Sequence, residues 1–416
     1  MSSHSPRRLL PTTRAQVSGH RFMRRRVEHG LIFGDIRMIH DPLASRQRAT
    51  IFSVVAVLLI AAITALFAWL RPNADPGDAP ILRSSSGELY VRINDIVHPV
   101  TNLTSARLIV GAPEQPQRIG DNNLLAQPRG VPVGLAVAPS LFAPRDSADL
   151  SWSACTSGGE VGVIAGPAAS PLAGASAVLA EVGGQQWLVT GEGRRELPPA
   201  DTPTGRVIRR ALGVDASTPR WSPPSQLLDA IKEDAPLDLP DPLPEVAVND
   251  ADAWAIAANG GVQPLSRLQS EILTQAGASQ RSVDSAELAQ LPDADPPSDI
   301  RLPAEVPAWV DPATETVCAT EAQVGATYTA PVPSSIALSG DAVAVAFSGL
   351  DDGSVAVDSG HGYHVVSIIG MRHDVPNRNV LDMIGAEHVE QVPWEIIALL
   401  PQGDTLTQDG ALVTAY

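Results

Sequence analysis

The stretch Ile51–Leu70, IFSVVAVLLIAAITALFAWL, contains twenty consecutive residues without a charged side chain. At the rise of an α-helix these residues span about 30 Å, the thickness of the hydrocarbon core of a bilayer. Hydrocarbon offers no hydrogen-bond partner to a backbone amide, so a segment that crosses it must be helical. The stretch therefore predicts one transmembrane helix over residues 50–71. A cleavable signal peptide is the alternative, but its apolar run is shorter, roughly 7–15 residues.

The two sides of this helix carry opposite charge. Residues 1–50 contain ten arginines and three acidic side chains, whereas residues 71–416 contain 19 basic and 43 acidic side chains. Basic residues near a membrane helix stay on the cytoplasmic side. We therefore expect a single-pass protein of the inner (cytoplasmic) membrane, with a cytoplasmic N-terminus and its bulk in the periplasm. The acidic outer region also argues against nucleic acid as a partner.

The arginine-rich segment before the helix, residues 1–49, is called the head. Thr13 and Gln16 have the spacing of a capping box, which predicts the start of a helix. Asp41-Pro42 predicts its end, because the residue before a proline avoids the helical conformation. Met23, Val27 and Leu31 recur at helical spacing, and Arg24, Arg25 and Arg26 can point outward. A basic amphipathic helix can lie on anionic lipid or pack on a protein partner, and composition alone favours lipid.

A short pattern recurs four times in the outer region. Each copy begins with an aromatic residue in a β-type run and continues through a turn and a short helical stretch to a glycine, the usual residue after a helix. A Leu-rich segment follows. We interpret the copies as repeated strand-turn-helix modules; chance recurrence in a chain rich in proline and glycine is the alternative. The anchoring aromatic residues are Tyr90, Trp187, Trp254 and Tyr363, and the glycines are Gly111, Gly213, Gly277 and Gly385.

Two intervals between the copies, residues 133–184 and 303–358, carry short apolar β-type runs and one cysteine each. The cysteines, Cys155 and Cys318, form an even pair in an oxidising compartment, which favours a disulfide over two buried thiols. Closing a loop of this length gives at most about 4–5 kcal/mol. The simplest account is a central β domain made from two distant segments and joined by the disulfide. The β-type runs are Val161–Ala165, Ala177–Val182, Ile336–Leu338 and Ala342–Phe347.

The predicted fold is therefore α+β, with a discontinuous central β domain flanked by four small modules. In chain order we expect the head (1–49), the transmembrane helix (50–71), a linker with module 1 (72–132), the first segment of the central β domain (133–184), module 2 (185–243), module 3 (244–302), the second segment of the central β domain (303–358) and module 4 with the C-terminal segment (359–416).

Enzyme motifs find no support in the sequence. A P-loop needs a glycine-rich loop before its lysine, and Lys232, the only lysine, stands in DAIKED. No GxSxG elbow of a serine hydrolase is present. The turns GEG, Gly191–Gly193, and DDG, Asp351–Gly353, are interpreted as hairpin turns. We therefore predict no catalytic residue and no cofactor.

Histidines and tryptophans are the remaining candidates for sites. The histidine spacing does not complete a tetrahedral metal set, so we predict no metal site and interpret these side chains as solvated residues at strand edges. Trp152 is expected to pack beside the disulfide. Trp221 and Trp394 either anchor interfaces or close their modules, and closure is favoured. The histidines are His361, His364, His373 and His388.

Several of these features together resemble the EccB family, core membrane subunits of the mycobacterial ESX (type VII) secretion systems. The resemblance covers nearly the whole chain, and the head with its DPL motif, Asp41–Leu43, is its most specific portion. The other matching portions are the anchor, the four modules, SWSAC at Ser151–Cys155 and LLPQG at Leu399–Gly403. The head reads TTRAQVSGHRFMRRRVEHGLIFGDIRMIHDPLASRQRA from Thr12 to Ala49.

The resemblance implies a structural subunit of a protein-secretion channel with an elongated, self-associating periplasmic region. The head is then expected to pack on the FtsK/SpoIIIE-like motor EccC and on multispanning EccD, with EccE at the periphery and a mycosin protease docked outside. The family is often labelled ATPase. A membrane-anchored ATPase is therefore one alternative. A cell-wall-binding protein is the other, because small extracellular repeats often bind peptidoglycan or glycans. The residues expected to bind partners are Arg21, Arg24, Arg25, Arg26, Val27, Leu31, Asp41 and Pro42.

Overall fold

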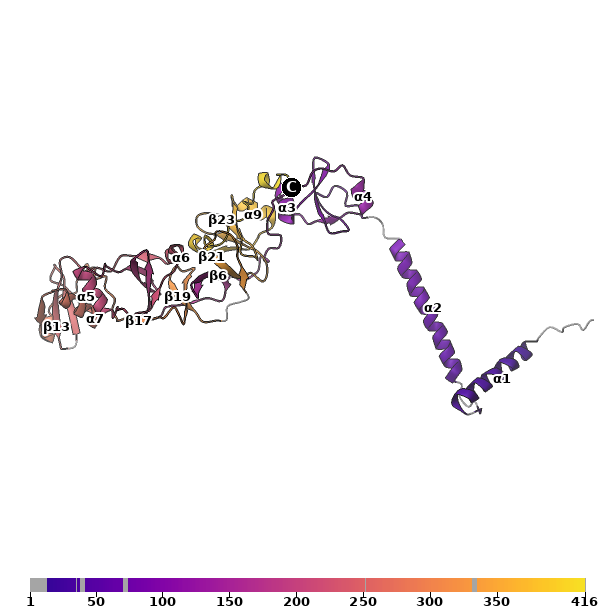
Figure 1. Ribbon diagram of the computed structural model, residues 1–416, viewed down its shortest axis with the longest axis horizontal. Helices are drawn as coiled ribbons and strands as arrows, with labels where there is room; N and C mark the ends of the chain where they lie inside the picture. The colour runs from indigo at the N-terminus through magenta and orange to yellow at the C-terminus, as the bar shows by residue number, and fades with distance from the viewer. Residues whose placement is uncertain are drawn as a thin grey trace, which may run out of the picture. The chain divides into compact units, whose positions relative to one another are not determined.

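The computed structural model describes residues 13–34, 36–37, 42–69, 74–250, 252–330 and 335–415. The chain divides into two compact units, Met1–Asn73 and Ala74–Tyr416. The first unit holds α1 and α2, and the second holds the described strands and the other described helices (Figure 1).

The first helix, α1 (Arg14–Phe33), begins at the predicted capping box. Thr13 is the N-cap, and its side chain and that of Gln16 each accept a hydrogen bond from the other residue's backbone N–H. The helix ends at Gly34, which adopts a left-handed conformation with φ of 70°. The predicted end at Asp41-Pro42 is therefore wrong, because glycine stops the helix earlier. Asp41 lies outside the described residues.

The second helix, α2 (Pro42–Trp69), is 28 residues long. Pro42 stands at its first position, where a missing backbone N–H costs nothing. Residues Arg48–Phe67 have a mean hydropathy of 2.7, and none of that stretch is buried in the structure. By length and composition, this is the one helix of the described residues that is able to cross a membrane. It contains most of the predicted transmembrane segment.

The largest sheet that the structure describes in the second unit has seven strands. Its order is β20-β21-β6-β5-β18-β19-β7, so it combines two distant segments of the chain. Cys155 and Cys318 stand opposite each other on antiparallel β5 and β18 and form the predicted disulfide across 163 residues. The strands are β5 (Ser151–Ser157), β6 (Glu160–Gly166), β7 (Ser170–Pro171), β18 (Thr316–Thr320), β19 (Gly325–Tyr328), β20 (Ser335–Ala337) and β21 (Ala344–Gly349).

Four smaller sheets share one strand order. In each, the second strand is antiparallel to the first and third, and the fourth returns parallel to the first. The strands are β1 (Ile81–Arg83), β2 (Leu89–Ile93), β3 (Ile96–Pro99) and β4 (Gln117–Arg118) in the first sheet; β8 (Ser176–Val182), β9 (Gln185–Thr190), β10 (Gly193–Glu196) and β11 (Arg220–Trp221) in the second; β13 (Glu245–Asn249), β14 (Asp252–Ile256), β15 (Val262–Leu265) and β16 (Gln280–Ser282) in the third; and β22 (Val355–Asp358), β23 (Tyr363–Val366), β24 (Arg372–Val375) and β25 (Val389–Gln391) in the fourth. The second sheet gains β12 (Glu233–Asp234) beside β10 and β17 (Ala308–Trp309) beside β8.

Each small sheet carries two helices, one before and one after its fourth strand. The first of each pair has a side-chain N-cap, namely Asn102, Thr202, Ser266 or Asn377, which satisfies one backbone N–H of the first turn. The four glycines named from the sequence follow these helices with positive φ. The helices are α3 (Leu103–Val110) with α4 (Asp121–Leu125), α5 (Pro203–Ala211) with α6 (Ser225–Asp229), α7 (Arg267–Gln275) with α8 (Ser285–Leu288), and α9 (Arg378–Ile384) with α10 (Trp394–Ile397).

Three strands lie in different sheets from those expected: β8, and also β17 and β22, which fall within the expected second central segment (303–358) but join the second and fourth small sheets. Three of the four β-type runs assigned to the central β region form β6, β20 and β21, but Ala177–Val182 falls in β8, which forms a hairpin with β9 of the second sheet. That assignment was wrong because an apolar run indicates a strand and not which sheet receives it. The boundary between residues 184 and 185 cuts this hairpin.

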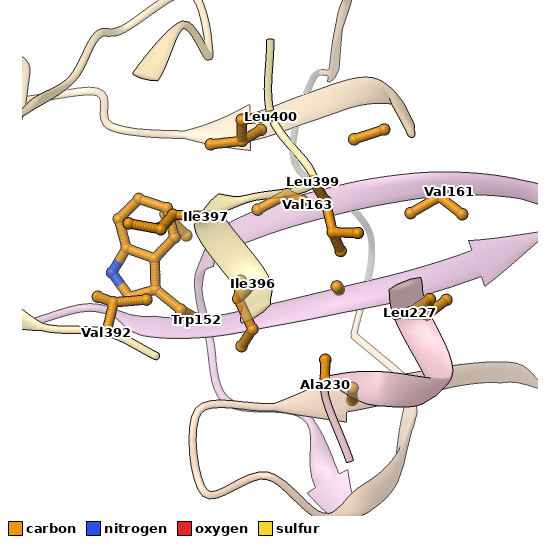
Figure 2. Close-up of a cluster of buried hydrophobic side chains, with 14 of the residues drawn as sticks. Trp152, Val161, Val163, Leu227, Ala230, Val392, Ile396, Ile397, Leu399 and Leu400 are labelled. Carbon is orange, nitrogen blue, oxygen red and sulfur yellow. The ribbon is translucent and has the colours of Figure 1, made fainter. Parts of the chain in front are cut away.

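Three clusters of buried side chains each join sheets and helices of different parts of the second unit. One core cluster combines the seven-stranded sheet with α6 and α10, and Figure 2 shows Ile396 and Ile397 of α10 beside Trp152 and Val163. A second cluster joins the second and third sheets through α5 and α7. A third joins the first and fourth through α3, α9 and the C-terminal α11 (Gln408–Ala411). The Arg107 guanidinium also donates to the Ile384 carbonyl at 2.7 Å, at the C-terminal end of α9.

Candidate functional sites: the head, the tryptophans and the polar clusters

The head presents an exposed apolar face. Met23, Val27 and Leu31 lie at successive i, i+4 positions of α1, and Leu31 is 82% exposed. Arg21 and Arg24–Arg26 are exposed on the same helix, and Arg24 contacts Glu28 at 2.9 Å. A row of exposed apolar side chains among arginines needs a partner surface or lipid to cover it.

The four aromatic anchors occupy one structural position. Tyr90, Trp187, Trp254 and Tyr363 all lie on the second strand of their small sheets and are half-buried. None of the four therefore projects fully into solvent.

Trp152 and Trp221 close contacts between sheets. Trp221 is 3% exposed on β11 and donates its indole N–H to Thr156 of β5 at 2.8 Å, which joins the second sheet to the seven-stranded sheet. Trp152 is buried, and its indole N–H donates to Glu390 at 2.6 Å. It does not pack beside the disulfide as expected, because residues three apart on a strand point to opposite faces, and Trp152 and the cysteines lie in different core clusters. Trp394 packs against the Arg372 guanidinium at 4.5 Å and the His364 ring at 5.3 Å. Trp394 therefore packs on the small sheet that carries its helix, as favoured, whereas Trp221 bonds to the seven-stranded sheet, so closure of its own module does not describe its contacts.

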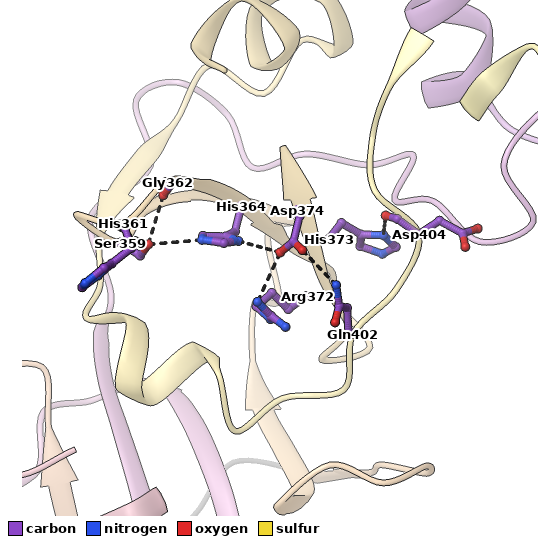
Figure 3. Close-up of polar contacts among 9 residues, drawn as sticks. All are labelled: Ser359, His361, Gly362, His364, Arg372, His373, Asp374, Gln402 and Asp404. Atoms are coloured by element: carbon purple, nitrogen blue, oxygen red, sulfur yellow. Dashed lines mark hydrogen bonds and ion pairs between the residues drawn. The ribbon is translucent and has the colours of Figure 1, made fainter. Parts of the chain in front are cut away.

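Three of the four histidines are buried, so their interpretation as solvated residues was wrong. His364 on β23 contacts Ser359 at 3.1 Å and Asp374 at 3.0 Å, and His373 contacts the Asp404 carbonyl at 2.9 Å (Figure 3). His388 lies beside Glu390. Only His361 of these four is exposed. Pairing of β23 with β24 places Asp374 opposite His364, and spacing along one strand does not reveal such a cross-strand partner.

Ser359 contacts His364, and His364 contacts Asp374, as in the catalytic triad of a hydrolase. The other contacts of these residues are those of a structural network. Ser359 is buried at the β22–β23 turn, and its hydroxyl also donates to the Gly362 carbonyl at 3.0 Å. Asp374 is shared with Arg372 and Gln402. We interpret these contacts as holding β22, β23 and β24 together.

Burial makes the fourth sheet sensitive to acid. Burial lowers the pKa of His364, and the nearby Asp374 carboxylate raises it by less. Burial likewise lowers the pKa of His373, and the hydrogen bond to the Asp404 carbonyl raises it by less. His373 Nε2 is buried and has no hydrogen-bond partner among the residues that the structure describes. Between the lowered folded values and about 6.5, the unfolded chain binds more protons than the folded chain, so stability falls as the pH falls through this range.

We therefore expect the melting temperature of the protein in detergent to fall between pH 7.5 and 5.5. His373→Asn, which keeps a donor near the Asp404 carbonyl, should reduce that pH dependence. His361→Asn, on the exposed histidine, should leave it unchanged. Thermal unfolding across this pH range measures both variants. If the melting temperature changed equally with pH in the two variants, His373 would not be a source of the acid sensitivity.

Lys232 stands outside any phosphate-binding loop. Its ammonium group contacts Asp234 at 3.1 Å, and its backbone N–H donates to the Gln323 carbonyl at 2.7 Å. Gly191–Gly193 forms the predicted hairpin turn between β9 and β10. Asp351–Gly353 is a turn but not a hairpin, because it joins β21 and β22, which lie in different sheets.

A polar cluster that was not apparent from the sequence lies where the fourth sheet meets the seven-stranded sheet. Asp149, His388 and Glu390 bring one side-chain ligand atom each within 4.8 Å of one another. His388 and Glu390 border a cavity of about 310 Å³, which Asp351 and Asp352 also line. His388 and Glu390 alternate along the chain, a spacing that puts both on one face of a strand. Asp149 comes from a distant segment, so the set could not be assembled from the sequence.

The profile of the family described as "Type VII secretion system ESX-1, transport TM domain B" matches residues 9–245 and 243–415. The chain belongs to the EccB family. This EccB-family chain is 27% identical to the ESX-1 secretion system ATPase EccB1 of Mycobacterium tuberculosis, over 97% of its own length and 94% of the relative's. It is 36% identical to the ESX-3 secretion system ATPase EccB3 of the same species over 55% of the chain, and that match spans 45% of the relative.

Chains in solved structures of ESX complexes share its fold. A chain of an intact ESX-5 inner membrane complex aligns with a TM-score of 0.67 and 26% identity, over 99% of this EccB-family chain and 97% of that one. A chain of the periplasmic assembly of the ESX-5 inner membrane complex aligns with a TM-score of 0.65 and 26% identity, over 83% and 98%. The fold of an EccB3 dimer from the ESX-3 core complex is also similar, with a TM-score of 0.66 and 22% identity over 80% and 100%.

Proposed function

We propose that this EccB-family chain is a structural core subunit of a type VII (ESX) secretion complex in the inner membrane. The observation that carries the proposal is the alignment of nearly the whole chain, α1 and α2 included, with a chain of an intact ESX-5 inner membrane complex. The apolar helix α2 supplies the membrane anchor. The charge difference across it supports a cytoplasmic head and a periplasmic bulk.

The head is proposed to dock on cytosolic and membrane partners. Its exposed apolar face and arginines suit a protein surface that carries both apolar and acidic side chains. The proposed partners are the EccC-like FtsK/SpoIIIE motor, EccD and EccE. A mycosin protease is proposed to bind the outer region, which is also proposed to self-associate.

The four small sheets with their helices are proposed to be copies of one repeat module around the central disulfide-linked sheet. The shared strand order, the side-chain N-caps and the aromatic residue on each second strand support this origin. A common module explains why three of the core clusters bring equivalent helices of different modules together, α3 with α9, α5 with α7 and α6 with α10.

A structural role is proposed in preference to an ATPase, although the relatives are named ATPases. An ATP site needs backbone amides around the phosphates and a lysine aimed at them, and Lys232 instead contacts Asp234. If a purified sample hydrolyses ATP, Lys232→Ala should leave that rate unchanged. A large loss of rate would support the ATPase alternative.

Gentle detergent extraction through a C-terminal affinity tag, followed by native mass analysis, tests the proposed function. We expect a large complex that contains an FtsK-like motor and a multispanning protein. A lone chain or a simple homodimer would contradict the proposal and favour the alternative of a cell-wall-binding protein, whose isolated outer region would sediment with cell walls.

A further inference from the structure

The cluster of Asp149, His388 and Glu390 is arranged around one point in space. His388 Nε2 lies 3.1 Å from Glu390 Oε1 and 3.5 Å from Asp149 Oδ1. A ring nitrogen carries at most one proton, so it cannot donate fully to both carboxylates. A divalent cation between the three atoms would satisfy both carboxylates and the imidazole together.

The separations match those of a metal coordination shell. Zinc bonds to histidine nitrogen and carboxylate oxygen are about 2.0–2.2 Å long, so neighbouring ligand atoms of a tetrahedral site lie roughly 3.3–3.5 Å apart. The two measured separations, 3.1 and 3.5 Å, lie close to this value. Imidazole and carboxylate together are a donor set that suits zinc and its neighbours in the first transition row.

Glu390 is held in place for such a role. Its side chain is 3% exposed, and burying a carboxylate is costly unless charge and hydrogen bonds compensate. Trp152 donates its indole N–H to Oε2 at 2.6 Å, and the Leu150 backbone N–H approaches Oε1 at 3.3 Å. Hydrogen bonds of this kind orient ligating carboxylates in metal sites. His388 is similarly enclosed, at 8%, whereas Asp149 approaches from an exposed loop at 80%.

The neighbouring cavity also favours a cation. It has a volume of about 310 Å³, and Asp351 and Asp352 line it in addition to His388 and Glu390. The described residues that line it include no arginine or lysine. A cation at the cluster would therefore sit at the edge of an electronegative hollow, with space for water at a fourth coordination position.

We propose that Asp149, His388 and Glu390 form a binding site for one divalent transition-metal ion of the zinc class. The ligand atoms are Asp149 Oδ1, His388 Nε2 and Glu390 Oε1, and the fourth position opens to the cavity. The site joins the fourth sheet, through β25, to the segment that enters β5 of the seven-stranded sheet. Metal binding therefore stabilises the contact between these two sheets.

The experiment uses the full chain in detergent, purified through a tag without histidine and treated with a chelator. Cobalt(II) and zinc(II) are the probes. Isothermal titration should show one tight zinc ion per chain, cobalt should give the visible absorption of a tetrahedral N/O site, and zinc should raise the melting temperature.

Asp149→Asn tests the site without disturbing the core, because Asp149 is exposed and its carboxylate contacts His388 at the edge of the cluster. It should weaken zinc binding at least 10-fold and abolish the thermal shift. Asp146→Asn, an equal charge change on the same loop, is the matched control and should behave as the unmodified chain. His388→Gln should lose the cobalt spectrum.

Two outcomes would overturn the proposal. One is the absence of stoichiometric zinc or cobalt binding to the chelator-treated chain. The other is equal binding by the Asp149→Asn, His388→Gln and Asp146→Asn variants, which would indicate adventitious binding by surface histidines outside the cluster.

Discussion

Replacing both Cys155 and Cys318 by alanine is expected to lower the free energy of unfolding by about 2–5 kcal/mol, the range found when a native disulfide is removed. The bond closes a loop of 163 residues, for which the loop-entropy relation gives an upper value of about 5 kcal/mol. It also joins the two segments of the seven-stranded sheet at directly opposed positions. Without it, the sheet must assemble from two ends of a long, unconstrained chain.

Alanine is preferred to serine because both sulfur atoms lie in an apolar cluster with Ile164, Ala326 and Tyr328. A buried hydroxyl without a partner would add its own cost. The measurement is urea unfolding of the full chain in mild detergent, followed by tryptophan fluorescence. Reduction of the unmodified chain should reproduce the loss, which serves as the control. A change below roughly 1 kcal/mol in both samples would show that the sheet does not depend on the bond.

Replacing Arg24, Arg25 and Arg26 by glutamate is expected to reduce recovery of partner subunits at least 10-fold. The change shifts the local charge by six units on a helix whose apolar face is exposed, and like charge across an interface costs several kcal/mol. The fold of α1 should survive, because the lost Arg24–Glu28 contact is solvent-exposed and such pairs contribute little. Co-purification through a C-terminal tag measures the loss.

Replacing the same three arginines by lysine is the matched control. It keeps the charge but removes the planar, two-pronged donor geometry of arginine. Retention by the lysine variant would assign the effect to charge, and loss in both would assign it to bidentate contacts. Basic residues also set the orientation of a membrane helix, so the glutamate variant could insert the wrong way round. Protease protection of the outer region tests this, and only an unchanged pattern assigns the loss of partners to docking. Normal assembly of the glutamate variant would contradict the docking role of the head.

Features fixed by local chemistry were predictable from the sequence. The capping box of Thr13 and Gln16, the apolar helix and the glycines after the small helices depend on near neighbours, and the structure contains each of them. The disulfide was predictable because two cysteines in one compartment leave a single intramolecular pairing.

Features that depend on tertiary pairing were not predictable in the same way. β8 has the same apolar pattern as the strands of the seven-stranded sheet, and its hairpin with β9 decides its sheet. His364 is buried because β24 brings Asp374 opposite it. Asp149 meets His388 only after two sheets have packed together. The end of α1 at Gly34 was missed because Asp41-Pro42 offered a second stop signal, which instead precedes a new helix.

The construction of the seven-stranded sheet from two distant segments has a consequence for biosynthesis. β5, β6 and β7 leave the ribosome before the second and third small sheets, and β18 and its neighbours follow only afterwards. The early half must therefore wait with open strand edges, which favour aggregation, and Cys155 must remain a thiol until Cys318 arrives. The inserted pair of small sheets can fold during this delay, since they share a core of their own. The seven-stranded sheet can therefore close only in a late, slow step, after most of the chain has been synthesised.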